Sequence, residues 1–302
     1  MELRVLRYFL AVAREESISG AAEHLHLSQP TLSRQLMDLE EELGKKLFVR
    51  GNRRITLTED GVLLRKRAGE ILELVEKTTG ELTAGQEALS GDVYIGAGET
   101  RGVHFLTRAA RRLQERHPQL RFRISSGDGV GVTEELDKGL IDFGLLFGPV
   151  NQAKYNCCQL PVHDIWGILM RRDSPLAQRQ FVQPGDLADR PLIVSRNLRE
   201  GGPLDAWLGR GLWELNIAAT YSLAYNASLM VEDGMGYALM LDGIINTSGD
   251  SPLCFRPLSP TVRAHMSVVW KKYQVFSKPA EAFLEALRQE GTGESGAGSG
   301  LV

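Results

Sequence analysis

The sequence predicts an α/β protein with a helical N-terminal part and a longer part in which strands and helices alternate. Residues 17–43 read as two short helices joined by a tight turn, and a basic β-hairpin follows them. From residue 91 onward, short apolar strands alternate with amphipathic helices, which is typical of a parallel sheet covered by helices. A chain of 302 residues is long enough for two such domains and a connector.

Composition and charge limit the classes of function. The net charge is −3, so any nucleic-acid site must be a local basic patch rather than a coat over the whole surface. Three cysteines provide no disulfide framework, and arginines interrupt any apolar signal core at the N-terminus. We therefore expect a cytoplasmic protein with reduced thiols, without a membrane partner and without a cofactor.

The organising stretch is a predicted helix-turn-helix with helices at 18–25 and 30–43, preceded by an amphipathic helix at 3–15 that packs beneath it. Leucines at spacings of four, three and four form a buried stripe on the second helix, and Gly44 ends it. Ser28 caps its N-terminus, which is also a phosphate site. Polar side chains that face outward from its first half are of the kind that read base edges. The alternative is an ordinary helical hairpin with a polar surface.

A basic β-hairpin is predicted directly behind this helix, with strands at 47–49 and 55–57 and a turn at Gly51-Asn52. Cationic side chains at a hairpin tip suit phosphates or a minor groove. A solvated basic hairpin is the alternative, but the position behind a recognition helix favours a DNA-contacting wing. Its cationic residues are Lys45, Lys46, Arg50, Arg53 and Arg54.

A long helix is predicted from residue 59 to residue 89, with Thr58 as its cap. Apolar or small residues along it alternate spacings of four and three, which predicts a dimerisation helix; a helix folded back onto its own domain is the alternative. The seam consists of Leu64, Ala68, Ile71, Val75, Thr78, Leu82, Gly85 and Leu89.

Residues 1–89 resemble the LysR-type transcriptional regulators, through LRYFLAVAREESISGAAEHLHLSQPTLSRQLMDLEEELGKKLFVR and then ITLTEDG. The resemblance implies a winged helix-turn-helix at 1–58, a linker helix at 59–89 and a C-terminal co-inducer domain related to type 2 periplasmic binding proteins. It also implies double-stranded DNA as partner, a homodimer that pairs into a homotetramer, and RNA polymerase as a further candidate partner. The expected DNA-binding residues are Ser28, Gln29, Pro30, Thr31, Ser33, Arg34, Arg50, Arg53 and Arg54.

The second domain, expected at 90–290, divides into two α/β lobes. We assign 91–160 and 268–290 to the first lobe and 161–267 to the second, joined by strands that cross near Leu160-Pro161 and Met266-Ser267. A ligand cleft is expected between the lobes. The Gly/Ser-rich residues 291–302 are expected to form a disordered tail.

Ligands bind at the carboxyl ends of strands in such lobes, and these ends supply the effector-site candidates. Two arginines near helix N-termini favour a small anionic effector, with a carboxylate as the expected group. A structural salt bridge is the alternative for each arginine. The candidates are Thr100, Arg101, Gly127, Asp128, Phe147, Ser195, Arg196 and Asn226.

Competing functions have weaker support. GAGETRG at 96–102, with Asp128 after the next strand, resembles some dinucleotide-binding turns, but no hydride-transfer constellation follows. No G-x-S-x-G elbow occurs, and the histidine and cysteine pairs lack metal-ligand spacing, so neither a catalytic nor a metal site is expected. A pure solute-binding protein would leave residues 1–89 unexplained. The sequence therefore predicts a non-enzymatic, effector-responsive DNA-binding regulator.

Overall fold

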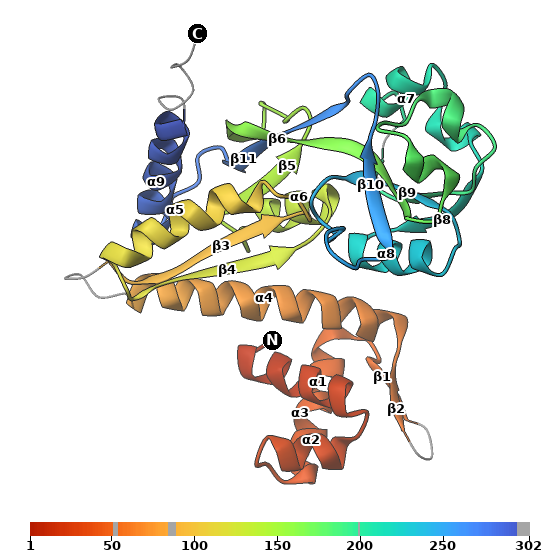
Figure 1. Ribbon diagram of the computed structural model, residues 1–302. Coiled ribbons are helices and arrows are strands. Elements are labelled where there is room, and N and C mark those ends of the chain that lie inside the picture. Colours follow the sequence, from red (N-terminus) through yellow and green to blue (C-terminus); the bar gives the residue numbers. More distant parts are fainter. Residues whose placement is uncertain (51–53, 84–88, 199, 295–302) are drawn as a thin grey trace. The chain divides into compact units, whose positions relative to one another are not determined.

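The fold was examined in a computed structural model of the chain, which describes residues 1–50, 54–83, 89–198 and 200–294 (Figure 1). The chain divides into two compact units, Met1–Thr83 and Ala84–Val302. Each unit is described separately below.

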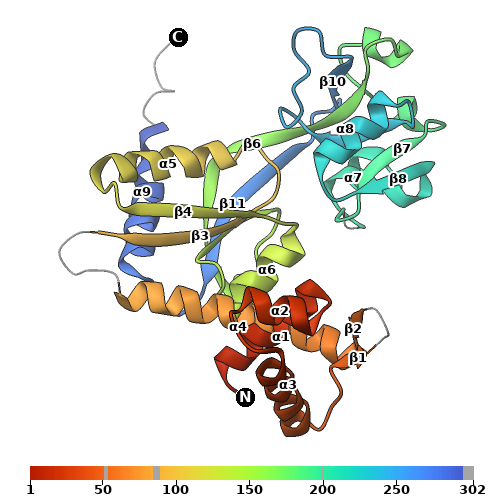
Figure 2. The ribbon, with the colours of Figure 1, turned by 90° about the horizontal axis from the view of Figure 1, so that it is seen from below.

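The first unit is a winged helix-turn-helix followed by a long helix (Figure 2). Ser28 accepts a hydrogen bond from the Thr31 amide at 3.3 Å, and Gly44, at φ +64°, ends the recognition helix in the left-handed region. The predicted caps are thus confirmed, and both helices of the motif lie within one residue of the predicted bounds. The elements are α1 (Leu3–Glu15), α2 (Ile18–His24), α3 (Gln29–Leu43), β1 (Phe48–Arg50), β2 (Ile55–Leu57) and α4 (Glu59–Thr83).

One apolar core holds the first unit together. Phe9 of α1 is fully buried, and its ring lies 5.2 Å from that of Phe48 in the wing. Leu32, Leu36 and Leu39 of α3 are buried in the same core, which confirms the packing of α1 beneath the motif and three of the four leucines of the predicted stripe. The fourth, Leu43, is 39% exposed, which corrects the prediction at the end of the helix.

The linker helix differs from the prediction in its length. It ends at Thr83, whereas a helix through residue 89 was expected. Leu89 is not helical, because its side chain packs against the apolar core of the second unit instead of continuing the seam. Residues 84–88 lie outside the described part of the chain.

The second unit consists of two α/β lobes built on one mixed sheet with the strand order β4-β3-β5-β11-β6-β9-β7-β8, while β10 pairs with β6. Lobe I contains β3 (Gly91–Ala97), α5 (Val103–Arg116), β4 (Leu120–Ser126), α6 (Gly129–Lys138), β5 (Phe143–Phe147) and α9 (Lys278–Glu294). Lobe II contains β7 (Leu192–Ser195), α7 (Pro203–Leu208), β8 (Ile217–Tyr221), α8 (Ala224–Glu232), β9 (Tyr237–Leu241) and β10 (Leu253–Pro257).

Two antiparallel strands, β6 (Tyr155–Arg171) and β11 (Arg263–Lys271), belong to both lobes. Each lobe adds parallel strands, β3, β4 and β5 in lobe I and β7, β8 and β9 in lobe II. The expected parallel sheets and crossing strands are present, but β6 is far longer than the strand predicted at 165–170. The pairing of β6 with β11 shifts register between His265 and Ser267. This shift lies opposite the stretch of β6 around Pro161, and a proline has no amide hydrogen to donate to the neighbouring strand.

The lobes have separate apolar cores. In lobe I, α9 packs beside α5. The ring centroid of Phe283 in α9 lies 5.0 Å from that of Phe122 and 5.5 Å from that of Phe143. The prediction that a disordered tail begins at residue 291 is wrong for its first residues, because α9 continues to Glu294. Its last turns are anchored by buried Glu290, whose carboxylate lies 2.9 Å from Arg108 Nε and 2.6 Å from Arg112 Nη1. Residues 295–302 lie outside the described part.

A search for membrane-spanning segments among the described residues found no helix with the necessary length and apolar character.

Glu40 joins the recognition helix to the wing, and we predict that its loss loosens the wing. Its carboxylate, only 8% exposed, accepts hydrogen bonds from the amides of Leu47 at 2.7 Å and Phe48 at 3.3 Å, and from Lys46 Nζ at 2.8 Å. Glu40→Ala leaves the buried Leu47 amide without its acceptor, which should cost about 1–3 kcal/mol. Native-state hydrogen exchange of the wing amides measures the loss, and exposed Glu41→Ala is the control.

The same contact makes a pH prediction. Although burial opposes ionisation of Glu40, hydrogen bonds from Lys46, Leu47 and Phe48 lower its pKa below the ordinary value. The stabilisation is therefore complete above the unfolded-state pKa and is lost as the pH falls through the folded-state pKa. Wing protection in the parent should fall through this acid range, and the contribution of Glu40 to that fall should be absent in Glu40→Ala. An identical pH dependence in the two chains would contradict the assignment.

Candidate functional site

The recognition helix α3 has a buried face and an exposed polar face. Ser28, Gln29, Pro30 and Thr31 are exposed, and the hydroxyls of Ser28 and Thr31 lie 2.7 Å apart. These groups surround the N-terminus of α3, where the exposed hydroxyls and the helix dipole favour a phosphate.

Further along α3, Ser33 is half-buried and Arg34 is exposed. Arg34 has no ionic partner among the residues that the structure describes, so its guanidinium is available for a base edge or a phosphate.

Two cationic side chains of the wing region are paired with carboxylates of the same unit. Arg54 Nη1 lies 3.1 Å from a carboxylate oxygen of Glu16, and Lys45 Nζ lies 3.4 Å from one of Asp60. Both pairs are largely exposed and are therefore easily exchanged for phosphates. Arg53 and the side chain of Arg50 lie outside the described part of the chain.

The predicted seam of α4 is divided between two environments. Its first half, Leu64, Ala68 and Ile71, packs against the unit's own core, which corrects the prediction that the whole seam faces a partner. Leu82, further along the seam, is 82% exposed, and on a neighbouring face of the helix Leu63 and Leu74 are 57% and 41% exposed.

In the second unit, the loop after β3 meets the crossing strands. The Thr100 hydroxyl donates to Asp164 Oδ2 at 2.5 Å and lies 3.1 Å from Met266 Sδ, so it touches both β6 and β11. The Gly102 amide donates to the same hydroxyl at 2.9 Å. A side chain at Gly102 would overlap the Met266 sulfur, so this close approach requires glycine.

The two predicted effector-site arginines are paired across the lobes. Arg101 Nη1 of lobe I lies 3.3 Å from Asp242 Oδ2 of lobe II. Arg196 Nη2 of lobe II lies 3.5 Å from Asp128 Oδ2 of lobe I, and the other Asp128 oxygen caps α6 through the Gly131 amide at 2.7 Å. Both guanidinium groups are thus paired with carboxylates of the same chain.

The remaining candidates form no single cluster with these pairs. Phe147 is 40% exposed, and Ser195 Oγ accepts from the Asn197 amide at 3.4 Å. Asn226 is exposed and is the third residue of α8. Gly127 is half-buried, and its amide donates to the Ala97 carbonyl at 3.0 Å.

Sequence reasoning missed three residues of this region, Asp164, Tyr221 and Asp242, whereas Glu99 was recognised as one of the residues at the end of the first strand. Glu99 Oε2 accepts from the Ala224 amide at the start of α8 at 2.5 Å, and Asp242 Oδ1 accepts from the Ile165 amide at 2.8 Å. Asp242 directly follows β9, so the strand-end rule could have found it. Asp164 was detectable as a charged residue beside an apolar strand.

Burial changes the acidity of two of these groups. Desolvation raises the pKa of Asp164, and the neighbouring carboxylate of Asp242 raises it further, while the Thr100 hydroxyl lowers it. Burial also raises the pKa of Tyr221, and the charge of Glu99 adds to that increase. The Tyr221 hydroxyl donates to the Leu239 carbonyl at 2.9 Å.

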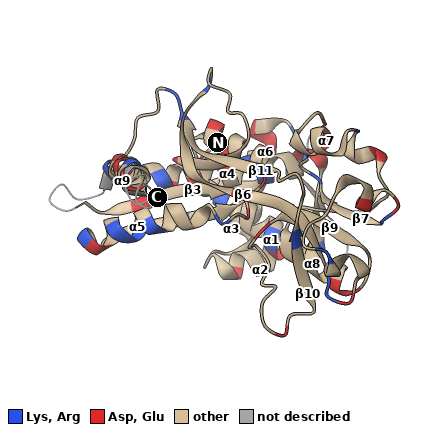
Figure 3. Ribbon diagram, turned by 45° about the horizontal axis from the view of Figure 1, so that its top comes forward, with Lys and Arg blue, Asp and Glu red and all other residues tan. Residues whose placement is uncertain are grey.

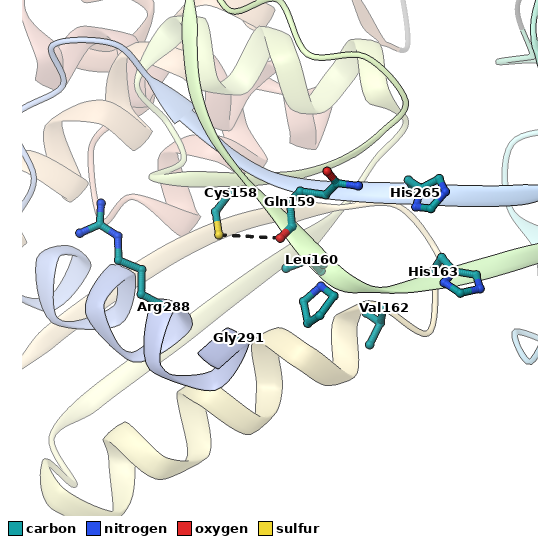
Figure 4. Close-up of a pocket in the computed structure, with 9 residues that line it drawn as sticks. Cys158, Gln159, Leu160, Val162, His163, His265, Arg288 and Gly291 are labelled. Carbon is teal, nitrogen blue, oxygen red and sulfur yellow. Dashed lines mark hydrogen bonds between the residues drawn. The ribbon is translucent and has the colours of Figure 1, made fainter. Parts of the chain in front are cut away.

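Two surface cavities lie away from these groups. One, of about 650 Å³, is lined by residues of β6, β11 and α9 (Figure 4), and the other, of about 600 Å³, lies beside α7. Within the described ranges, no group of three or more acidic, histidine or cysteine side chains is arranged to hold a metal ion.

A winged helix-turn-helix joined to a two-lobed α/β domain defines a DNA-binding regulator with a ligand-responsive part. The family model described as "Bacterial regulatory helix-turn-helix protein, lysR family" matches residues 3–62, and the "LysR substrate binding domain" matches residues 86–292. The chain belongs to the LysR family of transcriptional regulators. Its relatives are regulators, so the chain is not an enzyme.

Individual relatives cover almost the whole chain. The HTH-type transcriptional regulator BsdA of Bacillus subtilis is 38% identical over 94% of this chain and 99% of its own length. The Hca operon transcriptional activator HcaR of Escherichia coli is 30% identical over 96% and 98%. Full-length CbnR, solved with its target DNA, has the same fold at a TM-score of 0.75 and 21% identity, over 96% of this chain and all of that chain (100%).

The contact between Arg101 and Asp242 depends on Gly243, and Gly243→Ala should break it. Gly243 has φ +68°, and a side chain there would overlap Arg101 Cδ. The left-handed backbone alone should cost an alanine about 1–2 kcal/mol, and displacement of Arg101 should add to that cost. Gly209→Ala, at φ +69° in open space, is the matched control.

Thermal unfolding of the full chain measures both costs. In an Arg101→Ala background the two glycine substitutions should become equally costly, since no side chain remains to be displaced. An excess cost at Gly243 that survives in this background would show that Arg101 is not its source.

Proposed function

We propose that α3 contacts operator DNA through Ser28, Gln29, Pro30, Thr31, Ser33 and Arg34, with wing residues Arg50, Arg53 and Arg54 on the neighbouring backbone. The observation that carries this proposal is the two-faced character of α3, with buried leucines on one side and an exposed, ionically unpaired Arg34 on the other. We infer three functional parts, the DNA-binding domain through residue 58, the linker helix from 59 and the effector domain from 90 to 290. Action on chromosomal DNA places the protein in the cytoplasm.

Arg34→Ala should weaken operator binding by roughly 1–3 kcal/mol if the guanidinium reads a base. The loss should be much smaller on random DNA of the same length, because base contacts carry the sequence information. Electrophoretic titration of operator and random duplexes at one salt concentration measures both affinities. Equal losses on both duplexes would assign Arg34 to a phosphate, and no loss on either would remove α3 from the interface. Exposed Glu23→Gln on α2 is the control.

We infer a homodimer in which two α4 helices pair through their exposed apolar residues. Leu63, Leu74 and Leu82 lie on a helix of 25 residues, and burial against a second copy would remove them from water. A two-fold pair of recognition helices also matches two operator half-sites. We propose that such dimers associate into a tetramer on DNA, and that RNA polymerase is a further partner at activated promoters.

Leu74→Gln should weaken the dimer by roughly 1.5–3 kcal/mol for each leucine withdrawn from the contact. Analytical ultracentrifugation over a concentration series measures the dissociation constant. Glu73→Gln introduces the same residue at the neighbouring exposed position and should leave the constant unchanged. If both variants dimerise like the parent chain, the α4 interface is wrong.

We propose that a small-molecule effector binds between the lobes, at the groups around Thr100, Gly127, Phe147, Ser195 and Asn226. Thr100 contacts both strands that join the lobes, and two ion pairs bring charged groups of the two lobes together. Arg101 and Arg196 would accept an anionic effector, a small carboxylate, in exchange for Asp242 and Asp128. Such an exchange would link ligand binding to the relation between the lobes.

A further inference from the structure

We propose that a charged latch closes lobe I onto lobe II in the absence of effector, and that Glu99 is its central residue. This inference rests on the proposed effector function of the two lobes and adds the contact that an effector must release. The latch consists of three contacts between the lobes: Glu99 with the start of α8, Arg101 with Asp242, and Asp128 with Arg196.

The start of α8 lacks a cap of its own. Leu223 occupies the N-cap position, in an extended conformation, and its apolar side chain accepts no hydrogen bond. The adjacent Ala224 amide is instead satisfied by the Glu99 carboxylate of lobe I, at 2.5 Å. A carboxylate at a helix N-terminus is favoured by the helix dipole, so lobe I supplies in trans the cap that lobe II lacks.

Glu99 lies in partly buried surroundings. Its side chain is half-buried, Ala224 is 2% exposed, and the charge of Glu99 adds to the increase that burial causes in the pKa of half-buried Tyr221 on β8. Because Glu99 is less exposed than Arg101 and Arg196, water screens its contact with α8 less than it screens the two ion pairs.

The other two contacts continue the pattern with alternating sign. Lobe I presents Glu99, Arg101 and Asp128, while lobe II presents the positive end of α8, Asp242 and Arg196. Arg101 and Arg196 are 59% and 63% exposed, so their pairs are weak individually and can be exchanged. The latch therefore closes through complementary charges and opens without disrupting either apolar core.

The test compares four full-length chains: the parent, Glu99→Ala, Leu223→Asp and Glu115→Ala. Glu99→Ala removes the carboxylate. Leu223→Asp gives α8 a cap within lobe II and sets a like charge against Glu99, so it should open the latch without weakening lobe II. Glu115→Ala removes an exposed lobe I carboxylate whose ionic contact, with Arg111, stays within its own helix, and serves as the control.

The distance between the lobes is measured by electron–electron resonance. Spin labels are placed at Glu134→Cys in lobe I and Asp233→Cys in lobe II, both exposed, with Cys157→Ser and Cys158→Ser to prevent labelling elsewhere. Labelled chains are diluted with unlabelled chains, so that distances within one chain dominate. Glu99→Ala and Leu223→Asp should shift or broaden the distance distribution, whereas Glu115→Ala should match the parent.

A second readout follows the Ala224 amide. Its hydrogen exchange should accelerate about tenfold in Glu99→Ala, because the amide loses its acceptor. In Leu223→Asp the new side chain should instead protect the amides of Tyr225 and Asn226, which an N-cap residue reaches. Opened lobes together with protected Tyr225 and Asn226 amides in Leu223→Asp would separate release of the latch from damage to α8. If neither variant changes the distance distribution, the latch is overturned.

Operator footprints of the same chains separate this inference from the proposed function. If the parent binds an operator specifically but the distances are unaffected by either variant, the regulator stands and the latch fails. If both variants open the lobes but the parent prefers no DNA fragment over random competitor, the latch stands and the proposed function fails.

Discussion

The structure of the second unit depends on the antiparallel pairing of β6 and β11. These two strands run through both lobes, so each lobe completes its own sheet with the same pair of strands. A lobe therefore cannot separate from the other, and the relation between them varies only where the ladder is weakest. That place is the register shift between His265 and Ser267, opposite the stretch around Pro161. Side chains that lie near this shift contact the strands of both lobes, so a change in their contacts can alter how the lobes are arranged.

Asp164 lies next to this shift on β6, where it pairs with Ala264, and it is 3% exposed. A buried carboxylate requires compensation, and here it comes from the Thr100 hydroxyl on the loop after β3. The same hydroxyl lies against Met266 on β11, so one side chain connects the loop to both crossing strands. The effector-site candidates on this loop are thus attached to the elements that determine how the lobes are arranged. A molecule that displaced Thr100 would act directly on the crossover.

The sequence predicted those features that depend on interactions between residues close together in the chain, and it missed features that depend on residues far apart in the chain. The helix-turn-helix was predicted within one residue because its caps, Ser28 and Gly44, and its leucine stripe act over a few positions. The length of β6 was missed because Pro161 interrupts its local pattern, whereas the strand is defined by partners on β9, β10 and β11. The ion pairs of Arg101 and Arg196 join residues 141 and 68 positions apart, and no local pattern encodes such pairs. A rule that places ligands at strand ends selects candidate loops but does not show which of their side chains already bind each other.

The charged contacts between the lobes also explain how a small ligand can have a large effect. A ligand changes the balance between two arrangements only by as much as its affinities for them differ. Exposed ion pairs contribute little each, so a few of them hold the lobes in one arrangement without making the alternative inaccessible. The buried cores of the two lobes, by contrast, share only the crossing strands and do not need to repack. A difference of a few kcal/mol between the ligand's binding free energies for the two arrangements is therefore sufficient to shift the balance.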